Sequence, residues 1–339
     1  MFFHELQIDP YAATPKYMQL VNAVLSALEN GKLEQGDSLP SINELSAELD
    51  ISRDTAEKCY KNLKCHGVLD SIPGKGYFIK AAGGKKRLKI FLLFNKLSTH
   101  KKIIYDSFIA TLGSEAMIDF YIYNNDYNLF RKILSEKKDD YTHYVIIPHF
   151  VEGGDLAHNL INALPKEKLL LLDKNLPFIN GNYAAVYQRF EDDIYGALEE
   201  AVDRLGKYDT LKLIFPKHSY YPKEIVSGFL LFCQQYAFDY IVADRLEEKE
   251  PAGGVAYITV LEDDLVSLIE KIKDKNLEIG KEVGVISYNE TPLKKIIMNG
   301  ITTISTDFKQ MGIEAAQLIT SNKHEHVEVP FSIILRDSL

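Results

Sequence analysis

The residues from Ser52 to Leu69 form the chain's clearest chemical pattern, a helix with one apolar side and one basic side. Ser52 can cap the backbone amides of the first turn. Helical spacing of four apolar residues predicts a buried stripe: Ala56, Cys59, Tyr60 and Leu63. Outside this stripe lie four cationic residues: Arg53, Lys58, Lys61 and Lys64. Cationic side chains on one helix face bind phosphates, so this helix suits insertion into a DNA groove.

A short glycine-rich hairpin is predicted directly after this helix. Pro73-Gly74-Lys75-Gly76 forms the turn, and Tyr77-Phe78-Ile79 is an apolar strand. The hairpin adds a basic tip beside the helix. Helix and hairpin together are typical of a groove-binding unit.

Two earlier helices must position this one. Residues 15–30 predict the first helix, with Thr14 as its cap and Gly31 as its terminator. Ser41 to Glu44 is a capping box that opens a second, short helix. A tight turn at residues 50–51 then leads into Ser52, so the sequence predicts a helix-turn-helix with a wing.

At this point residues 15–79 resemble the winged-helix domain of GntR-family transcription regulators. The motifs, in order, are P-x-Y, G-x-L-x-x-G-D-x-L-P-S, E-L-S, S-R-x-T, L-x-x-x-G-V-L and G-x-G-Y-F-I. The resemblance implies that DNA is contacted by Ser41, Ser52, Arg53, Thr55 and Gly76, with Lys58 and Lys75 as phosphate partners. Ser41 and Ser52 are expected to cap their helices whether or not they also contact DNA.

Two positions depart from the family pattern. Members often carry arginine where Asn43 stands, and arginine or lysine where Glu57 stands. Arginine reads guanine through two hydrogen bonds, whereas Glu57 can only accept one, for example from cytosine, and Asn43 suits adenine or a phosphate. We therefore expect an operator different from that of the arginine-bearing members.

The charge balance of this segment is a mild argument against DNA binding. Residues 1–80 hold 8 Lys and Arg against 11 Asp and Glu. The stretch from Ser52 to His66 is nevertheless positive, with 4 basic residues against 2 acidic ones. We expect modest affinity for each half-site, and therefore a homodimer on double-stranded operator DNA.

The rest of the chain predicts a different kind of domain. Residues 81–87 have linker composition, which divides the chain into a DNA-binding domain (1–80) and a larger domain (88–339). In that larger domain predicted strands alternate with helices, as in doubly wound parallel sheets. Two such units predict an α/β fold with two lobes around a cleft, where the ligand lies at the carboxyl ends of the strands.

This larger domain resembles the LacI-type sensor domains, which are relatives of the periplasmic binding proteins. The similarity is greatest over residues 283–319, VGVISYNETPLKKIIMNGITTISTDFKQMGIEAAQLI. Ser287 replaces the usual glycine, Asn289 the first aspartate, and Ile225 the arginine of R-x-x-G-F, for which Lys223 can substitute. A GntR reader joined to this sensor resembles the arabinose-repressor group.

The candidate ligand-binding residues follow predicted strands. They are Lys96, Ser98, His149, Phe150, Asp173, Gln188, Arg189, Lys223, Asp263 and Asn289. Planar polar groups such as Arg189, Asn289 and Asp263 suit a polyol, and an aromatic face such as Phe150 covers its C–H surface. A purely structural role stays open for each residue, and Asp173 and Asp263 can equally be caps or loop groups. The resemblance implies a monosaccharide effector, with a pentose or deoxyhexose preferred.

The composition, and the motifs that the sequence lacks, limit which other functions the protein can have. The sequence contains no hydrolase, zinc-protease, Walker or dinucleotide motif, and its 3 cysteines lack metal-ligand spacing. We expect no catalytic residues, cofactor or metal. No apolar run is long enough to span a membrane and no signal peptide is evident, so a cytoplasmic location is expected. The alternative is a GntR-type regulator whose effector domain is enzyme-derived or binds a ligand other than a sugar.

Overall fold

The computed structural model describes residues 6–80, 87–113, 116–137 and 140–339. Two compact units emerge, unit 1 (Met1–Phe94, Gly113–Asn124 and Leu129–Ile146) and unit 2 (Asn95–Leu112, Asn125–Asn128 and Ile147–Leu339). The predicted linker at residues 81–87 lies outside the described residues except for Arg87. No helix in the described part of the chain is long and apolar enough to cross a membrane.

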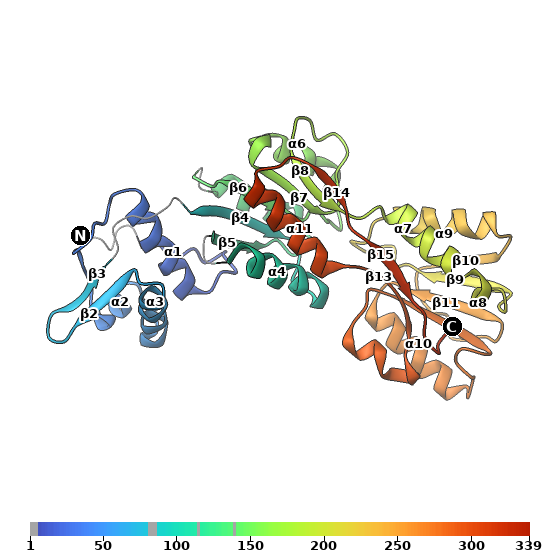
Figure 1. The fold of residues 1–339 in the computed structure, drawn as a ribbon. Helices are drawn as coiled ribbons and strands as arrows, with labels where there is room; N and C mark the ends of the chain where they lie inside the picture. Colours follow the sequence, from blue (N-terminus) through green and yellow to red (C-terminus); the bar gives the residue numbers. More distant parts are fainter. Residues whose placement is uncertain (1–5, 81–86, 114–115, 138–139) are drawn as a thin grey trace. The chain divides into compact units, whose positions relative to one another are not determined.

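The amino-terminal part of unit 1 is a winged helix-turn-helix, as predicted (Figure 1). Its elements are α1 (Lys16–Glu29), β1 (Ser38–Leu39), α2 (Ile42–Glu48), α3 (Arg53–Cys65), β2 (Leu69–Ile72) and β3 (Gly76–Ile79). The three strands form a small antiparallel sheet in the order β1-β3-β2. The apolar stripes of the helices meet in one core, where Leu20, Leu45 and Leu63 are buried.

The remainder of unit 1 provides a sheet to which α1 is attached. Strand β4 (Leu88–Phe94) pairs in parallel with β5 (Ala116–Ile122) and with β6 (His143–Ile146). Asn22 of α1 donates to the carbonyl oxygen of Ile118, and the backbone N–H of Phe120 donates to the Thr14 hydroxyl at 2.7 Å. Helix α1 is therefore hydrogen-bonded to β5. Helix α5 (Tyr127–Glu136) begins in unit 2 and ends in unit 1.

Unit 2 contains a set of three parallel strands, β7 (Leu169–Asp173), β8 (Ala184–Tyr187) and β14 (His326–Glu328). Helices α4 (Thr99–Leu112) and α11 (Phe308–Ser321) pack against each other. A shorter helix, α6 (Ala157–Asn162), follows the 3-10 turn η3 (Gly154–Leu156). The remaining 3-10 turns are η4 (Lys166–Lys168), η5 (Pro292–Lys295) and η6 (Ile297–Asn299).

Unit 2 also contains a six-stranded sheet in the order β10-β9-β11-β12-β13-β15. Its strands are β9 (Thr210–Ile214), β10 (Asp239–Ala243), β11 (Val255–Thr259), β12 (Val283–Tyr288), β13 (Thr302–Thr306) and β15 (Phe331–Ile334). Helices α7 (Phe190–Glu200), α8 (Val202–Leu205), α9 (Glu224–Gln235) and α10 (Glu262–Asp274) accompany it. Strand β15 runs antiparallel to β13, while the other pairings are parallel.

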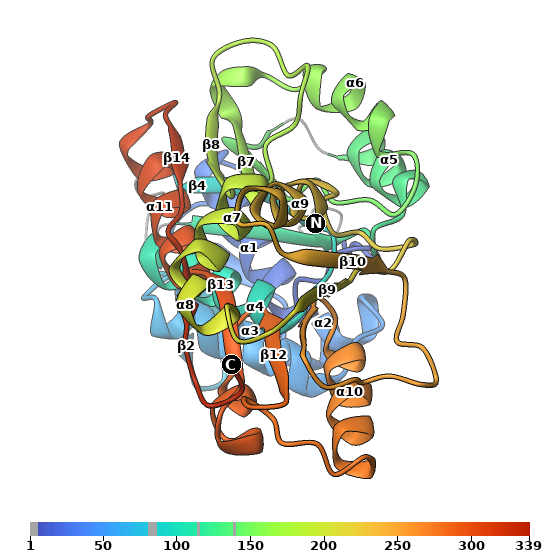
Figure 2. The ribbon, with the colours of Figure 1, turned by 90° about the vertical axis from the view of Figure 1, so that its right-hand side faces the viewer.

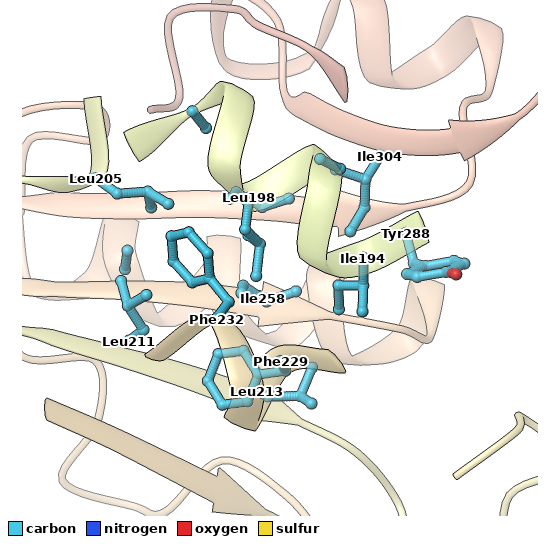
Figure 3. Packing of buried hydrophobic residues seen from close by; sticks show 14 of the residues in the cluster. Ile194, Leu198, Leu205, Leu211, Leu213, Phe229, Phe232, Ile258, Tyr288 and Ile304 are labelled. Carbon is cyan, nitrogen blue, oxygen red and sulfur yellow. The ribbon is translucent and has the colours of Figure 1, made fainter. Parts of the chain in front are cut away.

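Apolar side chains buried in the core of this sheet hold its helices in place (Figure 3). Ile194 and Leu198 from α7 meet Phe229 and Phe232 from α9 over the strand residue Leu213. Helices α7 and α9 approach closely at Gly228, where an added Cβ would lie 2.1 Å from the carbonyl oxygen of Glu191. The predicted α/β class is confirmed. The short strands β8, β13, β14 and β15 had not been predicted.

Candidate functional site

The exposed side of α3 is the candidate DNA-reading surface. The Ser52 hydroxyl accepts from the backbone N–H of Thr55 at 3.2 Å, which fixes the start of the helix. The stripe from Ala56 to Leu63 is buried, so Arg53 and Lys58 point away from the core and are exposed. In the described part of the chain neither cation has a carboxylate partner. Both remain available to bind phosphate or base edges.

The wing is held beside α3 by polar and aromatic contacts. Gly76 has a φ of +97°, a backbone conformation that side chains with a Cβ rarely adopt. Lys64 donates to the Ser71 hydroxyl and lies 5.0 Å from the centre of the Tyr77 ring. Lys64 therefore joins α3 to the wing, and Lys75 is exposed at its tip.

The structure brings the predicted DNA-contacting residues onto the exposed surface of α2, α3 and the wing. Eight are exposed and Thr55 is half-buried; the exposed ones are Ser41, Asn43, Ser52, Arg53, Glu57, Lys58, Lys75 and Gly76. Ser41 forms the predicted capping box, in which the Glu44 backbone N–H donates to its hydroxyl and the Glu44 carboxylate accepts from the Ser41 backbone N–H.

A cavity of about 210 Å³ in unit 2 is the candidate ligand site. Its lining comes from residues 95–100 and from segments that follow β9, β11 and β12. The lining residues are Lys96, Ser98, Thr99, His100, Tyr220, Tyr221, Val260, Leu261, Glu262, Asp263, Tyr288 and Asn289. The carboxyl ends of parallel strands are where ligands bind in open α/β sheets. Four predicted residues therefore reach this cavity: Lys96, Ser98, Asp263 and Asn289.

Asn289 and three tyrosines shape the wall of this cavity. The rings of Tyr220 and Tyr221 stack with centroids 4.7 Å apart. The Asn289 amide donates to the Tyr221 hydroxyl at 3.3 Å, and its own backbone has a φ of +63°. Tyr288 ends β12 and is buried, yet its hydroxyl has no hydrogen-bond partner in the described residues. Its ring lies at one end of the core beside Ile304 (Figure 3). An unpartnered buried hydroxyl is available to a ligand.

A smaller hollow continues inward to a buried charged cluster around Asp173. One Asp173 carboxylate oxygen accepts from Lys101 and from His149 Nε2, and the other accepts from the Gln188 amide. Burial opposes ionisation of Asp173, but the Lys101 ammonium and the His149 hydrogen bond outweigh it and lower its pKa. Burial also lowers the pKa of His149, which fits a neutral ring that donates from Nε2. Asp173 is therefore a fixed anion that orients its neighbours.

Gln188 joins this cluster to another part of unit 2. Its amide oxygen accepts from the hydroxyl of Thr306, the last residue of β13. Gln188 itself follows β8, where the chain passes to α7. The hydrogen bond therefore joins two places at which the chain passes from one sheet to the other.

Burial lowers the pKa of basic side chains near the cavity. Lys96 lies 4.1 Å from the centre of the Tyr220 ring, and burial together with Lys101 lowers its pKa. Burial lowers the pKa of His100 to about 3, so its ring is neutral at pH 7. Lys294 is buried and donates to the carbonyl oxygens of Tyr288 and Asn289. Lys294 therefore holds the turn that carries Asn289.

Three predicted ligand residues do not line either hollow. Arg189 forms ion pairs with Asp192 and Glu328, and Lys223 is exposed just before α9. Phe150 lies beside Gly154 and the Tyr127 ring. Ile225, at the position of the family arginine, is buried in the core and offers no polar group.

Sequence reasoning did not single out Tyr220, Tyr221 or Tyr288. All three follow or end strands, as Lys96 and Asn289 do, so position was the available signal. Aromatic residues at strand ends are more often part of a core, which is why the tyrosines were not chosen.

A larger cavity of about 330 Å³ lies in unit 1 between α1 and strands β4 and β5. Several of its polar groups pair with one another. The Tyr121 hydroxyl donates to Asp9, and the Asn22 amide donates to Asp119. We interpret this hollow as part of the attachment of α1 to β5.

Comparison with known proteins distinguishes two parts of the chain, the winged helix-turn-helix and the region of the six-stranded sheet. Residues 16–79 match the family model described as bacterial regulatory proteins, gntR family. Residues 204–339 match the model of a periplasmic binding protein-like domain. The chain joins a gntR-family domain to a periplasmic-binding-protein-like domain. The two models together cover α1 to β3 and β9 to β15.

Individual proteins are similar to one or both domains. The transcriptional repressor YtrA of Bacillus subtilis is 34% identical over 74 residues, which are 22% of this chain and 57% of YtrA. The arabinose metabolism transcriptional repressor of Geobacillus stearothermophilus is 20% identical, with 90% of each chain covered. The trehalose repressor structure from Escherichia coli has a TM-score of 0.58 and 14% identity, covering 73% of this chain and 99% of that one. Such a structural likeness establishes the fold of the periplasmic-binding-protein-like domain.

Proposed function

We propose that this protein is a dimeric, sequence-specific DNA-binding transcription repressor, without enzymatic activity, whose operator affinity a small carbohydrate controls. The observation that carries the proposal is the start of α3. There Arg53 and Lys58 are exposed and have no carboxylate partner among the described residues, beside a wing whose tip requires glycine. This pattern suits phosphate binding and base reading in a groove.

The reading residues have distinct proposed roles. Arg53 reads a base edge or binds a phosphate at the start of α3, while Lys58 and Lys75 bind phosphates. Glu57 accepts a hydrogen bond from a base, and Asn43 suits adenine or a phosphate. Ser41, Ser52, Thr55 and Gly76 contact the DNA backbone, the first two while capping their helices.

The cavity in unit 2 is the proposed effector site. Pockets for drug-sized ligands measure ~300–1,000 Å³, so a cavity of about 210 Å³ suits a smaller molecule. A sugar whose C–H face packs on the Tyr220 ring would take the place of the Lys96 ammonium, which lies over that ring. Ser98, Tyr288 and Asn289 offer hydroxyl and amide groups for its hydroxyls. A pentose or deoxyhexose is the proposed class, which the name of the Geobacillus relative supports.

Ligand control requires that the sugar bind one conformation better than another. The cavity walls come from residues 95–100 and from loops of the six-stranded sheet, so a sugar would hold these parts together. The Gln188–Thr306 hydrogen bond lies where the chain crosses between sheets, and a change in its geometry would follow ligand binding. We propose that the sugar-bound conformation has the lower operator affinity.

Selection of a duplex from a random-sequence pool, followed by band-shift titration, tests DNA reading. Arg53→Ala is expected to weaken binding of the selected duplex by about 1–3 kcal/mol per half-site. Lys323→Ala is the matched control, because Lys323 is an exposed cation in unit 2, paired with Glu325. Unchanged affinity of Arg53→Ala would refute the assignment of α3 as the reader.

A further inference from the structure

Strand β5 is the last strand in the order of its sheet, and the segment before α1 covers its outer edge. The backbone N–H of Ala13 donates to the carbonyl oxygen of Phe120 at 2.6 Å, and the backbone N–H of Phe120 donates to the Thr14 hydroxyl at 2.7 Å. Ala12 forms an isolated antiparallel bridge with Tyr121. Edge strands are often covered by another element. Here the cover leads directly into the winged helix-turn-helix.

Thr14 does not have the role that the sequence predicted for it. It was expected to cap α1, but Pro15 occupies the cap position, where it makes no side-chain hydrogen bond. The Thr14 side chain is buried, and its hydroxyl accepts from Phe120 and donates to the carbonyl oxygen of Ile118 at 3.4 Å. This hydroxyl therefore joins α1 to β5.

Helix α1 itself contacts β5 through polar and apolar side chains. The Asn22 amide is buried and donates to the carbonyl oxygen of Ile118 at 3.2 Å and to Asp119 at 3.3 Å. Met117 of β5 is 3% exposed and belongs to the apolar core of the winged helix-turn-helix. In Figure 1 and in Figure 2, α1 lies next to this sheet. Buried hydrogen bonds require a defined geometry, so they fix the orientation of α1.

Two further pairs join the same segment to β5 and to α5. The Tyr121 hydroxyl donates to Asp9 at 2.9 Å. Lys132 of α5 donates to the Tyr11 hydroxyl at 2.6 Å, and its ammonium lies 4.3 Å from the centre of that ring. The contact therefore extends from residue 9 into α1.

The candidate DNA-reading surface lies on other elements. It consists of residues on α2, α3 and the wing, where Arg53, Lys58 and Lys75 are exposed. The contacts to β5 described above come from residues 9–14 and from α1. They leave the reading surface open, so they suit an orienting role and not an inhibitory one.

We infer that residues 9–14 and α1 dock the winged helix-turn-helix on β5, as a second connection besides residues 81–87, and that this docking raises operator affinity by fixing the orientation of α3. An element already held in one orientation loses less freedom when it binds. Strand β4 pairs with β5 along its length and continues directly into Lys96 and Ser98 of the cavity wall, which makes the docking a route for the effect of a sugar. The effect on operator affinity rests on the proposed function, whereas the docking itself does not.

Amide hydrogen exchange of the full chain, followed by mass spectrometry, tests the docking without DNA. The double variant Thr14→Val, Asn22→Leu replaces both polar side chains by apolar ones of similar size. Peptides that contain Phe120 are expected to exchange about tenfold faster in this variant, because their hydrogen bonds to the segment are lost. Peptides from α3 are expected to exchange as in the wild type.

A second variant and a control accompany this measurement. Tyr121→Phe changes only β5 and removes the bond to Asp9, so residues 9–14 are expected to exchange faster while the helix-turn-helix keeps its own residues. Asn30→Ala is the matched control, because Asn30 is exposed and its amide donates to Ser26 of the same helix. No change in the exchange of β5 is expected for this control.

Band-shift titration of the selected duplex measures the role of the docking in DNA binding. The double variant keeps Arg53 and Lys58, yet its duplex affinity without sugar is expected to fall about fivefold or more. The change in affinity caused by a panel of pentoses and deoxyhexoses is expected to shrink.

Equal exchange of the Phe120 peptides in the wild type and the double variant would overturn the docking. Faster exchange with unchanged duplex affinity would overturn its role in DNA binding. If the α3 peptides also exchange faster, the double variant has lost its fold and Tyr121→Phe decides, since unchanged exchange of residues 9–14 would then overturn the docking. A wild type that selects no duplex would contradict the proposed function instead, and the exchange measurement would still decide the docking.

Discussion

Replacing Lys101 with methionine would leave the Asp173 carboxylate buried without its cation. Both side chains of this pair are only 3% exposed. Removing one partner of a buried ion pair costs about 3–5 kcal/mol, because the remaining charge is uncompensated. Whole domains are stable by about 5–15 kcal/mol, so the loss is a large fraction of the total. We expect Lys101→Met to lower the free energy of unfolding by about 3–5 kcal/mol at pH 7.

The effect should depend on pH in a defined direction. In the wild type the pKa of Asp173 is lowered, so its contribution is present above the unfolded pKa and is lost as the pH falls through the folded pKa. In Lys101→Met, burial without the cation raises the pKa of Asp173. Protonation then relieves the cost, and the deficit of the variant should shrink as the pH falls from 7 towards 5.

Urea unfolding followed by circular dichroism measures this effect, since the chain has no tryptophan to serve as a fluorescent probe. Lys102→Met is the matched control, because its pair with Asp106 is more than half exposed and should contribute less than about 1 kcal/mol. Adding Asp173→Asn to Lys101→Met removes the uncompensated charge. The double variant should recover about 2 kcal/mol. A loss below about 1 kcal/mol in Lys101→Met, or no recovery in the double variant, would refute this reasoning.

Three further predictions concern the cavity and its surroundings. Tyr288→Phe should keep the thermal midpoint of the free protein, since no described group bonds the hydroxyl, but should weaken sugar affinity; equal affinity would remove Tyr288 from the site. Thr306→Val breaks the bond to Gln188 and should change the ratio of operator affinities with and without sugar, measured by anisotropy; an unchanged ratio would exclude this link. Burial raises the pKa of Asp193 to about 6, so stability falls as the pH rises from about 4 to above 6. Asp193→Asn should therefore raise stability by about 1–2 kcal/mol at pH 7.5 and by less than half of that amount at pH 4.5, and equal gains at both pH values would contradict this cause.

Patterns of neighbouring residues were sufficient to predict most of the fold. The capping box at Ser41 and the hydroxyl cap at Ser52 specify where α2 and α3 begin, because the required groups are neighbours in the sequence. Strand β14 was missed because it has only three residues, and β8, β13 and β15 were missed because their pairing depends on distant segments. The antiparallel direction of β15 depends on where the chain crosses between sheets, which residue periodicity does not encode.

The ligand site was harder to predict from the sequence. Lys96 and Ser98 lie just after β4, Asp263 follows β11 and Asn289 follows β12, and all four line the cavity. Arg189 follows β8 yet forms an ion pair with Glu328, a partner far away in sequence. Asp173 has the predicted chemistry, but its carboxylate is already occupied by Lys101, His149 and Gln188. Only the packed structure distinguishes a polar residue that faces a ligand from one that orients its neighbours.

In the proposed function, one chain reads DNA through α3 and senses a sugar in unit 2. The most direct measurement is fluorescence anisotropy of the selected duplex, titrated with protein in the presence of individual pentoses and deoxyhexoses. At least one sugar is expected to weaken duplex binding about fivefold or more, and Tyr288→Phe is expected to reduce this effect while duplex affinity without sugar is kept. Failure to select any duplex, or a selected duplex whose affinity no sugar in the panel changes, would contradict it.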